Sequence, residues 1–412
     1  MSVEFKEVDA VYGITFPWQI SSITTDKESK EVSLYVRCTD ESTLQCPKCA
    51  RVYPVYDRRP RKWRHLDTGK YRTYVEAQIP RVKCPVHGVR TITVPWASRS
   101  ARMPFSFEAM AIDWLQEASI SAVARLLDLS WNAIDGIMRR AVERGLARRS
   151  EQSFTRIGVD ETSYKKGHKY ITVVSDSDTG TVLYAGQGRT KASLKQWYDQ
   201  FSPEQLERIE SVSMDMWPAY INQTKASVPG AEEKISFDRF HVAKKIGEAV
   251  DQVRRKEHKD LMKQGNEDLK GTKYDWLTNK ENMSTRQKKQ FQQLKNSSLK
   301  TARAWAIKEL SQRLWHYVSR TWALKGWKRW LSWAMRCRLE PMKKVAQTIK
   351  EHLWGIINAI VLRASNGGAE SINTRIKTVK IRACGFRNVE RMTTAIYFYL
   401  GGLDLYPECV RN

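Results

Sequence analysis

The sequence contains no long apolar run and few cysteines, and both shortages limit what the protein can be. No segment reaches the roughly 18 consecutive apolar residues of a membrane-spanning helix. The first residues, MSVEFKEVDAVYG, show no charged-then-apolar signal region. The seven cysteines are an odd number for a secreted disulfide framework, and the C-x-x-C pair among them favours metal binding. We therefore expect a cytoplasmic protein with no membrane partner.

Acidic residues are also scarce relative to basic ones. Asp and Glu number 45 against 70 Lys and Arg, which gives a formal net charge of +25 over 412 residues. A charge of this size implies an anionic partner, and nucleic acid fits best, because no convincing amphipathic membrane helix or lipidation motif is present. The 15 tryptophans argue against a merely soluble basic surface. The length predicts roughly two to four domains.

The first hundred residues are typical of short strands and turns that hold a metal site. Two knuckles, Cys46-Pro-Lys-Cys49 and Cys84-Pro-Val-His87, supply three thiolates and an imidazole. Four such ligands complete a tetrahedral zinc site with no open position for chemistry. We therefore predict structural Zn²⁺ bound by Cys46, Cys49, Cys84 and His87.

Residues 107–147 have the apolar periodicity of helices. Within SISAVARLLDLSWNAIDGIMRRAVERGL, Ser121 and Ser130 are candidate N-caps, separated by a short turn. This spacing predicts a helix-turn-helix whose helix from about 131 enters the major groove, although an ordinary helical hairpin has the same pattern. The residues expected to contact DNA on this helix are Trp131, Asn132, Arg139 and Arg140.

From about residue 155 the pattern changes to alternating strands and helices. Three strands are predicted within 155–187, a helix follows, and a fourth strand ends at Asp215, whereas the first ends at Asp160. The helical crossover returns the fourth strand beside the first, so the two carboxylates should lie close together. Carboxylates at that proximity repel each other unless a cation lies between them, and hard oxygen ligands suit Mg²⁺. A third acid would complete a two-metal site for phosphoryl displacement.

Residues 257–345 are predicted to be helical, and the 299–350 segment carries 13 Lys and Arg against 2 acids. The spacing of Trp327, Trp330 and Trp333 suggests a common helical face, either in a core or against unstacked bases. A Ser-Asn-Gly-Gly break then precedes a helix that carries Glu370.

Four segments in this order, GVDETSY, VSMDMWPAY, FDRFHVAKK and NGGAESINTRIKTVKIRACGFRN, resemble a bacterial insertion-sequence transposase of the DDE class, specifically the ISL-three family. The resemblance covers nearly the whole chain. It implies that Asp160, Asp215 and Glu370 are the catalytic acids that bind Mg²⁺ or Mn²⁺, with His241 as a helper at the scissile phosphate. Taken alone, Glu370 would be an ordinary first-turn helix acid, and Glu161 should point to the opposite face of its strand.

The resemblance also sets the expected fold, partners and function. The fold class is a multidomain α+β and α/β chain: a zinc-binding β domain (1–100), a helix-turn-helix (101–150), a ribonuclease-H-like mixed-sheet core (151–256), an all-helical insertion (257–345) and final core helices with the third acid (346–412). We expect a nucleoid-associated homo-oligomer, a dimer on DNA, that binds double-stranded terminal inverted repeats and target DNA. The alternatives are an inactive DNA-binding regulator and a structure-specific nuclease. Basic residues expected to line the DNA path beyond Glu370 are Arg375, Lys377, Lys380 and Arg382.

Overall fold

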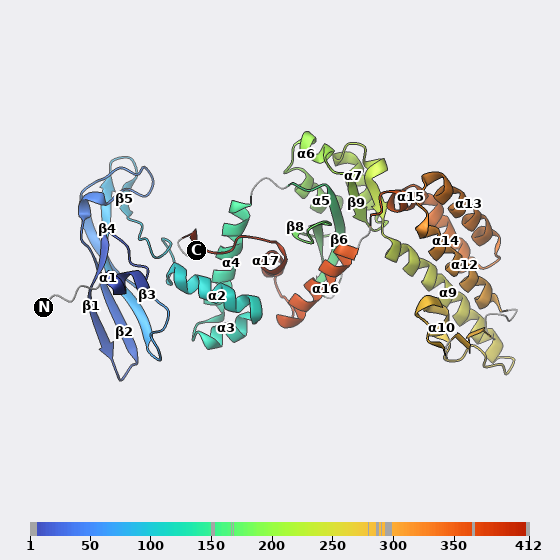
Figure 1. Cartoon of the computed structure of the whole chain (residues 1–412), viewed down its shortest axis with the longest axis horizontal. Helices are drawn as coiled ribbons and strands as arrows, with labels where there is room; N and C mark the ends of the chain where they lie inside the picture. The colour runs from blue at the N-terminus through green and yellow to red at the C-terminus, as the bar shows by residue number, and fades with distance from the viewer. Residues whose placement is uncertain are drawn as a thin grey trace. The chain divides into compact units, whose positions relative to one another are not determined.

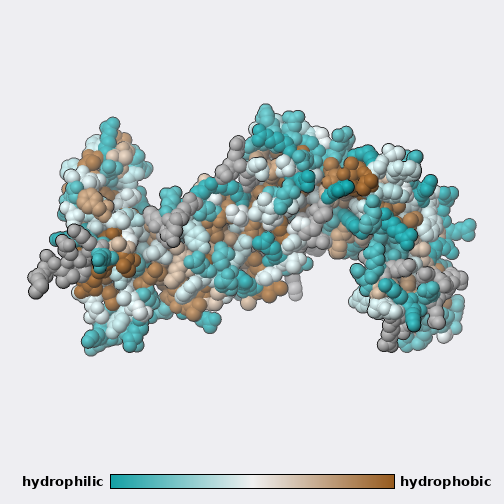
Figure 2. All heavy atoms as spheres, viewed as in Figure 1, coloured by the Kyte–Doolittle hydropathy of each residue, from teal (hydrophilic) through white to brown (hydrophobic). Residues whose placement is uncertain are grey.

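The computed structural model describes residues 6–149, 153–165, 167, 169–278, 280–285, 288–289, 291–292, 299–364 and 367–408 (Figure 1). The chain forms two compact units, and the first joins Met1–Ser150 with the C-terminal segment Leu403–Asn412. The second unit comprises Glu151–Gly402. Hydrophilic side chains predominate on the face shown in Figure 2, with smaller hydrophobic areas between them. Among the described residues, no helix is both long and apolar enough to span a membrane.

The first unit begins with a mixed five-stranded sheet. Strands follow the order β1-β2-β4-β3, with β5 paired to the end of β4, and β2 runs parallel to β4. Three tryptophans, Trp18, Trp63 and Trp96, pack edge to face in its buried core. Its elements are α1 (Lys6–Val11), β1 (Trp18–Asp26), β2 (Glu31–Cys38), η1 (Glu41–Thr43), β3 (Val55–Arg64), β4 (Arg72–Cys84) and β5 (Gly88–Thr91).

Three helices follow in the same unit: α2 (Phe105–Glu117), α3 (Ile120–Leu126) and α4 (Trp131–Arg148). The predicted cap of α4 is confirmed, because the Ser130 side chain accepts a hydrogen bond from the amide of Ala133. The predicted cap of α3 is wrong: Ser119, not Ser121, accepts from the amide of Ala122. The helix starts two residues earlier than the apolar pattern suggested, so Ser121 is already inside it.

The second unit is built on a mixed sheet with strand order β10-β9-β6-β7-β8. Strands β6, β7 and β8 are antiparallel neighbours, whereas β9 runs parallel to both β6 and β10. The predicted pairing of the first and fourth strands of this region is therefore confirmed. The predicted end of the first strand at Asp160 is wrong, because β6 stays paired with β7 as far as Lys165. The strands are β6 (Arg156–Lys165), β7 (Lys169–Asp176), β8 (Val182–Gln187), β9 (Ser211–Met214) and β10 (Ile235–Phe237).

Helices cover both faces of this sheet. One face packs on Leu194 and Trp197 of α5 and on Tyr220 of α7. The other packs on Ile372 of α16 and Ile396 of α17. The helices around the sheet are α5 (Lys191–Tyr198), α6 (Pro203–Glu207), α7 (Pro218–Ser227), α8 (Ala231–Lys234), α15 (Leu353–Val361), α16 (Gly367–Arg382) and α17 (Val389–Leu400).

A helical insertion separates β10 from α15. The long helix α9 leaves the sheet and packs against α10, α12 and α14, and the apolar core of the sheet continues into these helices. The elements of the insertion are α9 (Arg239–Met262), α10 (Lys273–Leu277), η2 (Lys280–Asn282), α12 (Lys300–Arg313), η3 (Leu314–His316), α13 (Arg320–Arg336) and α14 (Glu340–Glu351).

Candidate functional sites

Strand register brings the first two predicted acids together. Val159 of β6 pairs with Met214 of β9 in a parallel ladder, so Asp160 and Asp215 are the next residues on neighbouring strands. Asp238 follows Phe237, which pairs with Met214 from the other side. Asp238 is buried, and its side chain caps α9 by accepting a hydrogen bond from the amide of Phe240. Asp238 is thus a capping residue, and Asp160 and Asp215 remain the candidate cation ligands beyond the β6–β9 ladder.

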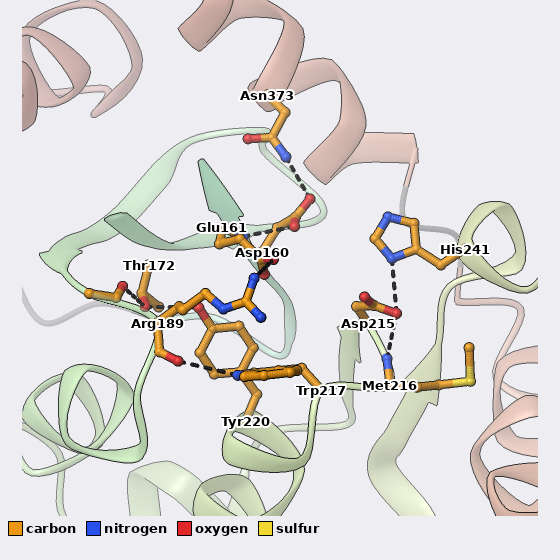
Figure 3. A network of polar contacts seen from close by, with 11 residues as sticks. Asp160, Glu161, Thr172, Arg189, Asp215, Met216, Trp217, Tyr220, His241 and Asn373 are labelled. Atoms are coloured by element: carbon orange, nitrogen blue, oxygen red, sulfur yellow. Dashed lines mark hydrogen bonds and ion pairs between the residues drawn. The ribbon is translucent and has the colours of Figure 1, made fainter. Parts of the chain in front are cut away.

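Hydrogen bonds fix both carboxylates (Figure 3). Oδ1 of Asp160 accepts from the amide of Glu161 at 2.7 Å, and Oδ2 accepts from Nδ2 of Asn373 at 2.5 Å. Oδ1 of Asp215 accepts from the amide of Met216 at 2.6 Å and lies 3.0 Å from Nδ1 of His241. Both side chains are thus oriented before any ligand arrives.

Burial and neighbouring charge separate the pKa values of the two acids. Burial raises the pKa of Asp160 to about 6, and the nearby carboxylates of Glu161 and Asp215 add to the effect. Burial also acts to raise the pKa of Asp215, but the contact with His241, the amide of Met216 and the charge of Lys245 together lower that pKa. The same contact raises the pKa of His241 to about 8. Burial and like charge disfavour ionised Asp160, and a bound cation would relieve both effects.

Sequence reasoning missed Asn373, which connects α16 to this edge of the sheet. Its Nδ2 holds Asp160, and its Oδ1 is buried without a hydrogen-bond partner among the described residues. Asn373 lies one helical turn after Glu370 in α16. Glu370 falls in the helix, but its side chain lies outside the described part of the structure. The i, i+3 spacing of the two residues could have drawn attention to Asn373.

Glu161 is held by an arginine that sequence reasoning also missed. Nη1 of Arg189 lies 3.2 Å from Oε1 of Glu161. The guanidinium lies 4.0 Å from the ring centroid of Trp217 and 4.8 Å from that of Tyr170. The backbone carbonyl of Arg189 accepts from Nε1 of Trp217 at 3.2 Å. Glu161 is thereby committed to an ion pair, which supports the expectation that it is not a metal ligand.

The four predicted zinc ligands lie together at the end of the first sheet. Their donor atoms all fall within 4.8 Å of one another. Cys84 Sγ lies 3.5 Å from Nδ1 of His87, and the Sγ atoms of Cys49 and Cys84 are 3.8 Å apart. Burial opposes ionisation of Cys84, but hydrogen bonds from the backbone and from His87 lower its pKa to about 6. Three sulfur atoms and one imidazole within this radius fit zinc.

The residues of α4 predicted to contact DNA divide into two groups. Asn132 and Arg139 are exposed, and Arg139 makes only a loose 3.7 Å pair with Glu143. Arg140, in contrast, donates from Nε to Oε1 of the buried Glu108 at 2.9 Å. This ion pair favours a structural role for Arg140. Trp131 at the start of α4 is half-buried.

Two basic residues of α16 contact backbone carbonyls of the sheet region. Nζ of Lys380 donates to the carbonyl of Ser163 at 3.0 Å, and Arg375 reaches the carbonyl of Gly180 at 3.4 Å. The guanidinium of Arg382 lies 5.8 Å from the ring of Tyr399. Lys377 is exposed.

Comparison with known proteins places these features in one family. Residues 157–396 match the ISL3 family of DDE domains described as "Transposase". Residues 42–87 match "zinc-finger of transposase IS204/IS1001/IS1096/IS1165", and residues 92–142 match "Helix-turn-helix domain of transposase family ISL3".

Full-length relatives agree. The chain is 31% identical over 387 residues to "Transposase for insertion sequence element IS1557" of Mycobacterium tuberculosis, covering 87% of this chain and 86% of the relative. It is 28% identical over 383 residues to "Transposase for insertion sequence element IS1001" of Bordetella parapertussis, covering 92% of each.

A mixed-sheet domain with paired acids, a zinc finger and a helix-turn-helix define a DNA-binding transposase, an enzyme that cleaves and transfers DNA strands. The chain belongs to the ISL3 family of DDE transposases. The family implies a divalent metal at the acids, and the zinc finger implies zinc at the Cys₃His cluster. The regulator and structure-specific nuclease alternatives are therefore not retained.

The C-terminal segment packs on the helix-turn-helix unit. Nη1 of Arg148 lies 3.2 Å from Oδ2 of Asp404, and the Tyr406 hydroxyl donates to Asp113 of α2 at 2.6 Å. Leu405 is buried. A Cβ added at Gly145 of α4 would lie 2.7 Å from Cβ of Leu403 and 3.1 Å from the carbonyl of Asp404. Only glycine lets the segment approach this closely.

Gly145→Ala is accordingly expected to release the segment and destabilise α4 by about 1–3 kcal/mol, the usual cost of overpacking. Gly136→Ala in the same helix is the matched control, because its added Cβ would lie 3.4 Å from Nη1 of Arg140, an ordinary van der Waals distance. That control should be neutral or stabilise α4 by up to about 1 kcal/mol. Amide hydrogen exchange of α4 in the full chain measures both. Equal protection in the two variants would contradict the packing argument.

Proposed function

We propose that Asp160, Asp215 and Glu370 form the catalytic triad of this transposase and bind Mg²⁺ or Mn²⁺ on a ribonuclease-H-like core. The observation that carries the proposal is the register of β6 and β9. Their parallel ladder stops at Val159 and Met214, so Asp160 in the middle of β6 lies beside Asp215, directly after β9. The strand order β10-β9-β6-β7-β8, with three antiparallel strands followed by two parallel ones, supports the core assignment.

The position of α16 supports Glu370 as the third acid. Asn373 anchors the first turns of this helix to Asp160 through a 2.5 Å hydrogen bond. Residues three apart share a helix face, so the helical position of Glu370 belongs to the face that approaches the strand end.

Each residue at this site has a task that follows from its contacts. When bound, the divalent ion would supply positive charge at the scissile phosphate and a more acidic bound water. Asn373 and the amide of Glu161 orient Asp160, and the amide of Met216 orients Asp215. His241, whose imidazole contacts Asp215, is placed to hold a positive charge beside the phosphate.

We propose that the first unit recognises the double-stranded terminal inverted repeats of the element. Helix α4 would lie in the major groove, with Trp131, Asn132 and Arg139 near the bases and phosphates. Lys377 and its basic neighbours on α16 would contact the backbone of the DNA that enters the catalytic site. An element has two ends, and cutting both together favours a homodimer bound to DNA. We expect this dimer to be associated with the bacterial nucleoid.

The proposal is tested with full-length protein and a labelled duplex that contains one element end. Cleavage and joining to target DNA are expected with Mg²⁺ or Mn²⁺. Ca²⁺ should support binding without turnover, because it is larger and less strict in its coordination geometry. Cleavage that persists in excess chelator would contradict a metal-dependent mechanism, and equal affinity for random duplex would contradict terminal-repeat recognition.

A further inference from the structure

Helix α13 of the insertion carries two different faces. The sequence RTWALKGWKRWLSWAMR contains five basic residues and no acid. The buried face fills the core of the insertion, and Nε1 of Trp330 donates to the carbonyl of Ile307 at 2.8 Å. Gly326 allows close packing here, because an added Cβ would lie 2.7 Å from the ring of Tyr317. These contacts fix the rotation of the helix and therefore the direction of its other face.

The opposite face is a stripe of exposed tryptophans and cations, which we call the α13 stripe. Its members are spaced by three and four residues, which places them within an arc of about 80° on an α-helix. Trp322 is 60% exposed and Trp333 is 39% exposed. Nζ of Lys325 lies 5.0 Å from the ring centroid of Trp322. The members of the α13 stripe are Trp322, Lys325, Arg329, Trp333 and Arg336.

Neither folding nor simple charge attraction accounts for this arrangement. The exposed part of each tryptophan contributes little to the stability of the fold, since that hydrophobic surface stays in water. Lysine and arginine alone would suffice to contact the phosphates of a duplex. Indole rings between cations suit a strand whose bases are free to stack while the cations neutralise its phosphates. The two tryptophans are eleven residues apart, about 16 Å along the helix, which spans about five nucleotides at 3.4 Å each.

We propose that the α13 stripe binds single-stranded DNA, the unpaired strand that forms when an element end is opened. The partner follows from charge complementarity and from the two exposed rings. Helix α13, which carries the stripe, belongs to the helical insertion (Figure 1). The proposal rests on the transposase function of the chain, but it does not depend on the assignment of the metal site.

The test compares binding of full-length variants to a fluorescent 20-nucleotide poly-dT strand and to a duplex of the same length, by anisotropy at one fixed salt concentration without divalent metal. The double variant Trp322→Ala, Trp333→Ala should bind the single strand about tenfold or more weakly, because the stacking of a base on each indole ring is lost. Binding to the duplex should change less than about twofold. Lys325→Gln with Arg329→Gln should weaken single-strand binding and reduce its salt dependence.

The matched control is another exposed aromatic–cation pair in the insertion. Tyr274 is 69% exposed, with Nζ of Lys273 at 5.5 Å from its ring centroid, but it is not part of the α13 stripe. Tyr274→Ala with Lys273→Gln should leave single-strand binding unchanged. Unchanged binding by the tryptophan variant would overturn the proposal. Equal losses of affinity for the single strand and for the duplex would also overturn it. A changed oligomeric state with normal DNA binding would overturn it too, because it would identify the α13 stripe as a protein interface.

Because these measurements need no catalysis, they separate this proposal from the catalytic one. A variant at Asp160 that cannot cleave should still bind the single strand through the α13 stripe. Thermal unfolding of each variant tests whether the insertion remains folded. This control matters most for Trp333, which is 39% exposed and otherwise buried.

Discussion

Replacing Asp160 or Asp215 with Asn is expected to abolish strand cleavage and strand transfer while leaving DNA binding intact. The two side chains follow paired residues on parallel strands and lie side by side. Either substitution therefore removes one charge from the same proposed cation site. Loss of a charged group that stabilises a transition state commonly costs about a hundredfold or more in rate. Asn is nearly isosteric with Asp, so each substitution changes the charge far more than the shape. The hydrogen bonds from Asn373 and from the amide of Met216 cannot replace that charge. Glu370→Gln should be equally inactive.

The matched control is the neighbouring acid on the same strand. Glu161→Gln changes the same charge one residue away, but Glu161 is paired with Arg189. It should retain cleavage within about threefold of the wild type. Its fold should be little affected, because Gln keeps a hydrogen-bond acceptor for Arg189 and the pair is still partly exposed. The assay is cleavage of the labelled element end, with binding measured in parallel. Wild-type cleavage by Asp160→Asn or Asp215→Asn would contradict the assignment. Inactivity of Glu161→Gln would mean that Glu161 takes part in the metal site.

The proximity of the two acids could be predicted because it depends on local patterns and one topological rule. Alternating strands and an Asp-Thr-Gly turn defined 155–187, and a crossover helix returned the fourth strand beside the first. The zinc ligands were predictable for the same kind of reason, since the two knuckles close on short turns. In the first case the strand topology brings the two acids together, and in the second the short turn of each knuckle holds its two ligands close.

The partners of these residues could not be predicted, because they come from packing between distant elements. Asn373 and Asp160 are 213 residues apart in the sequence, and their hydrogen bond depends on how α16 lies on the sheet. Arg140 looked like a phosphate ligand from its exposed helical position. It instead pairs with the buried Glu108 of α2, which no periodicity on α4 reveals.

The tryptophans of α13 show the limit of reading faces from spacing. Trp327 and Trp330 are fully buried, whereas Trp333 is 39% exposed. Each step of three residues turns about 60° short of a full rotation, so a series of three such residues does not share one face. Trp333 instead lies on the same exposed face as Trp322. This can be recognised only when the burial of each residue is known.

Cys49→Ser is expected to remove zinc from the protein and to unfold the two knuckles while leaving the rest of the first sheet in place. A structural zinc contributes on the order of 10 kcal/mol to a small site, so residues 42–53 and 84–88 should lose their amide protection. The sheet itself keeps an independent apolar core around Trp18, Trp63 and Trp96, and the second unit shares none of it. Cys38→Ser is the matched control, because Cys38 is also half-buried in this sheet but its thiol contacts the carbonyl of Asp40. Elemental analysis should find about one zinc per chain in the wild type and in Cys38→Ser, and far less in Cys49→Ser. A full complement of zinc in Cys49→Ser, or none in well-folded wild-type protein, would contradict the site.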